Sequence, residues 1–273
     1  MSIPVPSTDL VKPALAGKVA AIARLLTRAE NGADEVFDAL GEIYRHAGRA
    51  HIVGITGVPG SGKSTLLRLI LGLPGMQQDD QMQLEGEVEV AGRQVFDLDQ
   101  RQLQELRWQV GVVKWGGGLI ENMDVRRNIC LPLAYRASHF SGDDIDRRCV
   151  EIMNRLDIAH LAGLGRRPVT LNAEERAYVS LARALINEPI LLLVDDATLG
   201  MGEETAQRFI EHLFAGRGLP RLMVTTRVLP YVNRGDRFYL LEKGTVIPLG
   251  DRQELLGCDH PWIRAELANS SWG

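Results

Sequence analysis

Apolar residues follow two patterns along the chain, short continuous runs and runs spaced by three or four positions. Residues 51–56 and 190–194 are largely continuous apolar runs, which are typical of strands covered on both faces. Residues 143–156 carry apolar positions at helical spacing, which predicts a helix with four inward side chains: Ile145, Val150, Ile152 and Leu156. The same patterns predict helices at 99–108, 173–187 and 203–215, and strands at 86–90, 110–113, 221–226 and 237–242. This alternation predicts an α/β fold, a mostly parallel sheet with helices on both sides.

The first fifty residues differ from this alternation. Residues 1–8 hold prolines and small polar residues, which favours a loose arm. Two amphipathic helices are expected after the arm, one with Val19, Ile22 and Leu26 on a face and one centred on Leu40 and Ile43. We therefore expect three parts: an arm and helical extension over 1–50, an α/β domain over 51–257 with an inserted helical subdomain near 108–185, and a C-terminal tail over 258–273.

A glycine-rich sequence joins the first predicted strand of the α/β domain to a predicted helix. It consists of Gly57, Val58, Pro59, Gly60, Ser61, Gly62, Lys63, Ser64 and Thr65. Glycines at this spacing let backbone N–H groups surround phosphates without Cβ clashes, and the helix N-terminus favours an anion. Lys63 would contact the β- and γ-phosphates, and the Ser64 hydroxyl would ligate Mg²⁺. The sequence therefore predicts a P-loop that binds a magnesium nucleotide.

A second candidate site element ends the apolar run at 190–194. Asp195 and Asp196 follow this run directly. A buried strand with an acid at its carboxyl end can carry a carboxylate to the nucleotide, where it holds Mg²⁺ through water. We expect Asp195 to serve the metal and Asp196 to be a weak candidate for the general base.

Bulk composition narrows the choice of partners and of compartment. The chain has 273 residues and a net charge of −4, so its overall electrostatics favour neither nucleic acid nor anionic lipid. Its three cysteines lie far apart in sequence with neither metal nor redox spacing, and its six histidines show no ligand spacing. The chain has no run of 18 apolar residues, so we do not expect it to be transmembrane itself. Its N-terminus lacks the charged and apolar regions of a signal peptide, which predicts a cytoplasmic location.

Residues 51–257 resemble the ATP-binding-cassette (ABC) ATPases in several segments that occur in the same order. Besides the P-loop, these are residues 84–95, 181–189, 191–196 and 236–244. The resemblance implies a P-loop α/β fold of ABC type, ATP and Mg²⁺ as ligands, and a membrane permease subunit as partner. It also allows a second ABC-type subunit and a peripheral location on the inner face of the cell membrane. Residues 118–133 are similar to a segment of Mla/Mce-type lipid transporters, which favours a lipid-related cargo.

Five positions that serve hydrolysis in this family are altered here. The Q-loop glutamine is replaced by Trp115, which has no oxygen to coordinate a cation. The acid after the Walker B aspartate is Asp196 rather than glutamate, and the switch histidine is replaced by Arg227, which cannot exchange a proton near neutral pH. The remaining changes are in the signature at 171–175 and in the D-loop at 197–202. The resemblance therefore implies an intact phosphate cradle with weak or absent hydrolysis.

The altered signature also bears on dimerisation. In the resembling family, each ATP lies between the P-loop of one subunit and the signature of the other. Here Glu174 and Glu175 would place two negative charges near that phosphate. Asn172 and Glu175 also fit a capping box, which would simply begin the helix at 173.

A second resemblance covers the N-terminal part alone. Residues 14–67 are similar to the start of the MeaB/ArgK chaperone GTPases, and residues 233–236 superficially match a guanine-reading motif. A turn before the strand at 237 accounts for that motif more simply, because its lysine is absent. Tyr44 is a candidate platform for the base, against the commoner role of a helix-face aromatic in a core. ATP is favoured as ligand and GTP is not excluded.

Two functions of different classes follow from these observations. The first is the nucleotide-binding subunit of an ABC-type membrane transporter, with weak or absent hydrolysis. The second is a non-hydrolysing, nucleotide-responsive regulator or assembly factor whose N-terminal helices bind a protein partner. Whether the chain is an enzyme depends on how much turnover survives these substitutions.

Overall fold

A computed structural model describes residues 6–15, 21, 24, 51–73, 85–136, 140–216 and 218–268. The chain divides into two compact units, residues 1–50 and 51–273. In the first unit a 3₁₀ helix, Ser7–Leu10, leads into α1, Val11–Leu15. Because the 3₁₀ helix begins at Ser7, the prediction of a loose arm through residue 8 is wrong at its last two positions. Tyr44 and the positions that define the two other predicted helices lie outside the described residues.

The second unit is built on a six-stranded sheet, ordered β4-β5-β6-β1-β7-β8. Neighbouring strands from β4 to β7 are parallel, and β8 pairs antiparallel with β7. The strands are β1 (Ile52–Thr56), β4 (Val110–Lys114), β5 (Leu191–Asp195), β6 (Arg221–Thr225), β7 (Arg237–Glu242) and β8 (Thr245–Gly250). This arrangement confirms the predicted α/β fold with a mostly parallel sheet. It also brings the carboxyl ends of β1, β4 and β5, where the candidate residues lie, to one edge.

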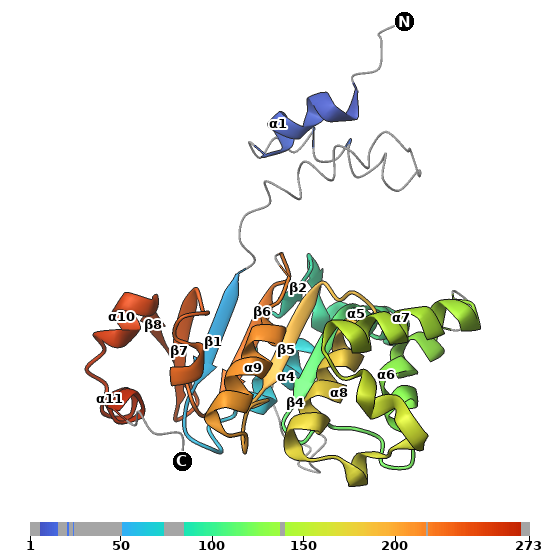
Figure 1. Ribbon diagram of the computed structural model, residues 1–273. Helices are drawn as coiled ribbons and strands as arrows, with labels where there is room; N and C mark the ends of the chain where they lie inside the picture. Colours follow the sequence, from blue (N-terminus) through green and yellow to red (C-terminus); the bar gives the residue numbers. More distant parts are fainter. Residues whose placement is uncertain are drawn as a thin grey trace, which may run out of the picture. The chain divides into compact units, whose positions relative to one another are not determined.

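Alternate residues of β5 show how the sheet is covered on both faces. Leu192 and Val194 pack into one apolar cluster, which α6, α7, α8 and α9 complete. Leu193 packs into another on the opposite face, with Leu67 of α4 and Leu106 of α5. The helices are α4 (Lys63–Ile70), α5 (Gln100–Gln109), α6 (Val125–Ala134), α7 (Gly142–Arg155), α8 (Ala173–Leu185) and α9 (Glu203–Leu213). Figure 1 shows α6, α7 and α8 gathered beside the β4 end of the sheet.

The opposite end of the sheet is covered by the C-terminal segment. Helices α10 (Arg252–Leu256) and α11 (Pro261–Ala268) lie beside β7 and β8 (Figure 1). Ile263 of α11 is fully buried in a third apolar cluster with Phe238 and Leu240 of β7. The residues expected as a tail therefore include a helix that is packed on the sheet.

Two local predictions differ from the structure. Val150 was expected on the inward face of the helix at 143–156, but its side chain is 53% exposed, and Cys149, Ile152 and Met153 are the buried residues of α7. The strand expected at 86–90 is only Glu89–Val90, β2, which pairs with β3, Arg93–Gln94. The error at Val150 is one of face, since a shift of one residue along a helix moves a side chain to another face, and the error at 86–90 is one of strand length.

A pair of hydrogen bonds ties the start of β1 to the start of β7. The Ile52 amide donates to the Asp236 carboxylate at 2.7 Å, and the Asp236 amide donates to the Ile52 carbonyl at 2.8 Å. The Asp236 side chain is thus used inside the fold. This confirms the predicted turn before the strand at 237.

Candidate functional site

The loop between β1 and α4 has the backbone shape of a phosphate cradle. Gly57, Gly60 and Gly62 have φ values of 154°, 81° and 99°, which L-residues with a side chain rarely adopt. A Cβ on Gly57 would lie 2.3 Å from the Leu241 carbonyl oxygen, so only glycine fits there. A Cβ on Gly60 would meet nothing within 4 Å. The loop is therefore packed against β7 on one side and open at Gly60 on the other.

Lys63 begins α4 and lies inside this loop. Its Nζ donates to the carbonyl oxygens of Gly57 at 2.7 Å and Val58 at 3.0 Å. Burial lowers the pKa of the Lys63 ammonium, and the nearby carboxylates of Asp196 and Asp195 oppose that shift. An incoming phosphate would satisfy this desolvated cation more fully than two neutral carbonyls do.

The Ser61 hydroxyl also fits a phosphate ligand. Its oxygen is buried and has no hydrogen-bond partner among the residues that the structure describes. A buried hydroxyl without a partner is unfavourable, and a phosphate oxygen would supply one. The residues present therefore fit the β- and γ-phosphates of a nucleotide.

Asp195 ends β5 beside the P-loop. Its Oδ1 accepts a hydrogen bond from the Ser64 hydroxyl at 3.0 Å, although the two residues are 131 positions apart. Burial raises the pKa of the Asp195 carboxyl, and the hydrogen bond from Ser64 opposes that shift. A hydroxyl and a carboxylate in contact are the oxygen ligands that Mg²⁺ takes beside substrate phosphates. The structure thus brings together the two residues that the sequence predicted for the metal.

Asp196 follows in the left-handed region, with φ 44°. Its Oδ1 accepts hydrogen bonds from the Thr226 amide at 2.6 Å and the Thr226 hydroxyl at 3.0 Å. The carboxylate that the sequence proposed as a weak base is therefore held by the loop after β6. Arg227 comes next in that loop, and its charge acts on Glu266 of α11, whose carboxyl pKa is raised by burial.

Trp115 follows β4 at the same edge of the sheet. Its amide donates to the Asp195 carbonyl at 2.8 Å, while its side chain is 60% exposed. Gly116, Gly117 and Gly118 follow it with φ values of 69°, 80° and 51°. This run of left-handed residues turns the chain sharply away from the sheet.

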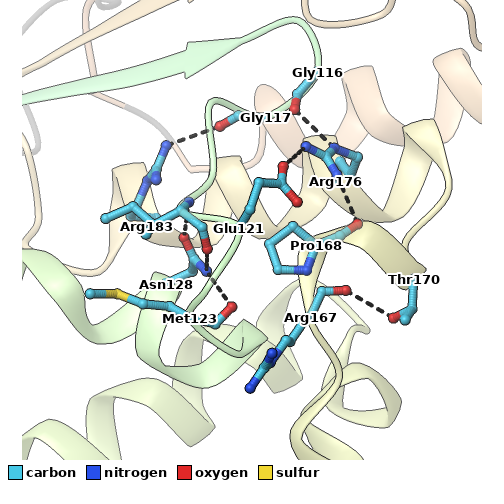
Figure 2. A network of polar contacts seen from close by, with 11 residues as sticks. Gly116, Gly117, Glu121, Met123, Asn128, Arg167, Pro168, Thr170, Arg176 and Arg183 are labelled. Carbon is cyan, nitrogen blue, oxygen red and sulfur yellow. Dashed lines mark hydrogen bonds and ion pairs between the residues drawn. The ribbon is translucent and has the colours of Figure 1, made fainter.

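Two arginines of α8 hold that glycine turn, as Figure 2 shows. Arg176 donates to the Gly116 carbonyl at 3.1 Å and to the Pro168 carbonyl at 2.8 Å, and pairs with Glu121 at 2.5 Å. Arg183 donates to the Gly117 carbonyl at 3.0 Å. This network was not predicted from the sequence, because most of its acceptors are backbone carbonyls, which leave no mark in the residue types.

A buried amide holds the segment after the glycine turn. The Asn128 side chain accepts from the Ile120 amide at 2.8 Å and donates to the carbonyls of Ile120 and Met123 at 3.0 and 3.1 Å (Figure 2). Asn128 lies on α6 and is fully buried. The segment from Trp115 to Met123 is therefore attached to both α6 and α8.

The signature segment begins α8 with a complete capping box. The Asn172 side chain accepts from the Glu175 amide at 2.8 Å, and the Glu175 carboxylate accepts from the Asn172 amide at 2.9 Å. Arg166 also pairs with both oxygens of Glu175, at 3.0 and 3.1 Å. Of the two negative charges that the sequence predicts here, that of Glu175 is therefore paired with Arg166. Glu174 lies in the first turn without sharing these bonds.

Comparison with known proteins agrees with this arrangement. Residues 43–199 match the family described as ABC transporter, so the chain belongs to the ABC transporter family. Proteins of this family bind ATP with Mg²⁺, and their ATP-binding subunits work with membrane permease subunits. In the described residues, the helices are all too short or too polar to cross a bilayer.

Similar proteins include ATP-binding proteins of methionine import. The chain is 32% identical over 227 residues to Methionine import ATP-binding protein MetN of Rhizobium meliloti (strain 1021), covering 81% of this chain and 59% of that protein. It is 30% identical over 207 residues to Methionine import ATP-binding protein MetN of Clostridioides difficile (strain 630), covering 75% of this chain and 61% of that protein. The chain thus spans about three fifths of the length of these relatives.

Solved structures show the same fold. The ATP-binding cassette MJ0796, in a dimeric post-hydrolysis state bound to ADP and Pi, superposes with a TM-score of 0.63 at 27% identity, covering 73% of this chain and 84% of that one. CbiO1 from Clostridium perfringens, part of the ABC transporter complex cbiONQ, gives 0.63 at 20% identity, covering 77% and 80%. The second likeness concerns the fold alone.

Proposed function

We propose that this chain is the nucleotide-binding subunit of a membrane transporter and binds Mg·ATP with slow turnover. The observation that carries the proposal is the 3.0 Å hydrogen bond between Ser64 of the P-loop and Asp195 of β5. This contact places a metal-binding pair beside Lys63 before any ligand arrives. The location that goes with this function is the cytoplasmic face of the membrane, against a permease.

The roles of the site residues follow from their positions. The open backbone from Gly57 to Gly62 would surround the phosphates, and Lys63 would exchange its bonds to Gly57 and Val58 for phosphate oxygens. Ser64 and Asp195 would hold Mg²⁺, which screens the phosphate charge when bound. Thr65 continues α4 beside them, with its amide near the positive end of the helix dipole.

The proposal of slow turnover rests on three residues at the positions that orient or deprotonate the attacking water in this family. Asp196 already accepts two hydrogen bonds from Thr226, both at Oδ1, so this oxygen is engaged and the carboxylate is less free to move. Trp115 offers no oxygen to the metal, and the guanidinium of Arg227 has hydrogen-bond donors but no acceptor for a proton of the water. Each of these residues stands in place of a group that would orient or deprotonate the attacking water.

Thermal denaturation with Mg·ATP and Mg·GTP tests nucleotide binding. A ligand at 100 times its dissociation constant adds about 2.7 kcal/mol of stability, which is a clear rise in melting temperature. Lys63→Ala should remove that rise, whereas Lys243→Ala, in the turn between β7 and β8, should keep it. A wild-type protein whose melting temperature does not respond to millimolar ATP or GTP would refute the proposal.

We propose two candidate cargoes for the transporter. The methionine-import relatives make methionine the first substrate to test, and the segment 118–133 supports a lipid as the second. Uptake of labelled methionine and extraction of labelled phospholipid can be measured in a strain lacking this gene, with and without a plasmid copy. Restoration of one activity by wild type and not by Lys63→Ala identifies the cargo.

A regulator or assembly factor is the second candidate, because residues 1–50 form a compact unit separate from the nucleotide-binding one. The two functions differ in the partner that binds. Affinity purification of the full chain from membranes and from the soluble fraction, followed by mass spectrometry, distinguishes them. A multi-spanning permease supports the transporter, and a soluble enzyme supports the regulator.

A further inference from the structure

Lys114 is the last residue of β4 and lies next to Asp195, the last residue of β5. The two residues are direct partners in the parallel register of these neighbouring strands (Figure 1). Just beyond them, the Trp115 amide donates to the Asp195 carbonyl at 2.8 Å, so the two strand ends stay together. No role for Lys114 was predicted from the sequence.

The side chains of Lys114 and Asp195 belong to the same face of the sheet. Successive side chains along a strand point to opposite faces, so residues two positions apart share a face. Val112 and Leu193, each two residues earlier, pack in the apolar cluster that includes Leu67 of α4. Lys114 and Asp195 therefore extend toward the face that α4 covers, where the P-loop lysine and serine also lie.

Lys114 is exposed, and its charge is not used within the fold. Among the residues that the structure describes, its ammonium forms neither a hydrogen bond nor an ion pair, whereas Lys63 donates to two carbonyls of the P-loop. Residues 116–118 are all glycine, so that turn brings no side chain to cover Lys114. Burial raises the pKa of the Asp195 carboxyl, and the charges of Lys114 and Lys63 both oppose that shift. Two lysines therefore act on one carboxylate.

The order of the strands places Lys114 relative to the phosphates. The P-loop follows β1, and β6 and β5 lie between β1 and β4. Asp195 is therefore between the P-loop and Lys114, and its hydrogen bond with Ser64 marks the position expected for the metal beside the β- and γ-phosphates. A phosphate chain that extends from the loop past this contact presents only its terminal group to Lys114.

We propose that Lys114 binds the terminal phosphate of the bound nucleotide and supplies part of the positive charge that Mg²⁺ brings there. The inference rests on the proposed function, because it takes Mg·ATP as the ligand of the P-loop. A hydrogen bond from an ammonium to a phosphate is roughly twice as strong as one between neutral groups. Trp115 offers no oxygen to the metal, so Lys114 adds positive charge at the edge where this metal ligand is missing.

Two properties of nucleotide binding follow from this placement. Binding of ATP should persist when Mg²⁺ is removed, because the chain itself presents two ammonium groups, Lys63 and Lys114, to the phosphates. Without Mg²⁺, ATP should also bind more tightly than ADP, because the terminal phosphate of ADP ends before it reaches Lys114. The side chain thus contributes to the choice between the two nucleotides.

Isothermal titration calorimetry of the full chain tests the inference with ATP and with ADP, each in Mg²⁺ and in EDTA. We expect Lys114→Ala to weaken ATP binding in EDTA by about tenfold or more, which is the size of one lost charged hydrogen bond. The loss in Mg²⁺ should be smaller, and ADP binding should change little in either condition. Lys114→Arg keeps the charge and should bind ATP like wild type.

Lys243→Ala is the matched control for this experiment. Lys243 follows β7 at the same edge of the sheet, but β7 is three strands away from β5. Its substitution should therefore leave all four affinities unchanged. The melting temperatures of the free proteins show whether each variant is folded, and the exposed position of Lys114 predicts that Lys114→Ala folds.

Two results would overturn the inference while the proposed function stands. One is that Lys114→Ala has the affinity of wild type for ATP in EDTA, or that neither protein binds ATP there, although both bind Mg·ATP. The other is that Lys114→Ala weakens ATP and ADP by the same factor, which would exclude a contact made by the terminal phosphate of ATP alone. A wild type that binds no nucleotide in either condition would refute the proposed function and this inference together.

Discussion

The carboxylate of Asp196 accepts two hydrogen bonds from Thr226, one from its amide and one from its hydroxyl. This contact joins the end of the β5 segment to the loop after β6, where Arg227 stands. It engages the acid that the sequence indicates as a weak candidate for the general base. The rate of ATP hydrolysis is therefore expected to depend on the loop after β6 as well as on Asp196.

The first prediction is that purified protein hydrolyses ATP slowly. Typical enzymes turn over at about 1–10³ s⁻¹, and loss of a general base costs about 10²–10⁴-fold. We expect wild type to remain below about 0.1 s⁻¹, and Asp196→Glu with Trp115→Gln and Arg227→His to be faster. The rate of phosphate release measures turnover of wild type and of the triple variant, and Lys63→Ala provides the background rate. Wild-type turnover near 1 s⁻¹ that disappears in Lys63→Ala would contradict the prediction.

The second prediction is that Asp195→Asn makes the free protein more stable and its nucleotide site weaker. Burial raises the pKa of Asp195, so its ionised form is unfavourable in the folded state at neutral pH. Because asparagine is uncharged and can still accept from Ser64, we expect a rise in melting temperature of about 1–4 °C. The extra stabilisation by ATP that depends on Mg²⁺ should fall.

The pH dependence of that gain has a definite sign. A carboxyl whose folded-state pKa is raised costs stability once it ionises, so the difference between Asp195→Asn and wild type should be largest at neutral pH and should narrow as the pH falls through the folded-state pKa of Asp195. Asp251 is the matched control, because hydrogen bonds from the backbone at the start of α10 lower its pKa. Asp251→Asn should show no gain. An equal gain in both variants would mean that net charge is the cause.

The third prediction concerns the arginine that holds the glycine turn. Arg176→Ala removes contacts to Gly116, Pro168 and Glu121, so we expect a loss of about 1.5–3 kcal/mol in the free energy of unfolding. Hydrogen exchange should become faster in residues 115–121. Arg176→Lys can keep the pair with Glu121 but not both carbonyl contacts. Its free energy of unfolding should therefore lie between those of wild type and Arg176→Ala.

The control for Arg176 is an exposed arginine. Among the residues that the structure describes, the Arg208 side chain of α9 pairs at the surface with Glu204, and such pairs contribute about 0.3–0.5 kcal/mol. Arg208→Ala should therefore change neither the stability by more than this nor the exchange of residues 115–121. If Arg176→Ala behaves like Arg208→Ala, the turn is held by its glycines and not by α8.

The fourth prediction is that ATP does not drive a symmetric homodimer. If the chain pairs head to tail, Glu174 meets the partner's phosphate, and at about 5 Å with an effective dielectric of 20 one like-charge pair costs roughly 3 kcal/mol. The helix dipole contributes about 1 kcal/mol in the other direction. Glu175 adds little, because Arg166 neutralises it. We therefore expect a monomer by light scattering with Mg·ATP.

A restored signature provides the comparison for the dimer. Asn172→Ser, Ala173→Gly and Glu174→Gly together keep a capping residue and remove the charge. This variant should dimerise with Mg·ATP in the Lys63 wild-type background and fail to do so with Lys63→Ala. Dimerisation of the unmodified chain to the same extent would show that Glu174 does not oppose the contact.

The sheet and the phosphate site could be predicted because their signals are local. A continuous apolar run identifies β5, and the glycines from Gly57 to Gly62 with Lys63 predict both the loop and its ligand. The pairing of Ser64 with Asp195 also followed, since carboxyl ends of parallel strands share an edge. In each case the residue types and their spacing were sufficient.

Contacts between distant segments could not be predicted in this way. The bond from Arg176 to Gly116 depends on a backbone carbonyl, which leaves no trace in the residue type. The rotation of α7 about its own axis is another such feature, and it turns Cys149 inward and Val150 outward. Periodicity alone gives a face to within about one position, and these features depend on that position.

The two hydrogen bonds between Ile52 and Asp236 fix the strand that carries the P-loop at its first residue. A force applied to the chain before residue 51 therefore acts first on these two hydrogen bonds, which lie five residues before Gly57. The pair therefore anchors the first residue of β1 to the residue that precedes β7. Tags, fusions or alternative N-terminal sequences joined at that point should leave the geometry of Lys63 unchanged.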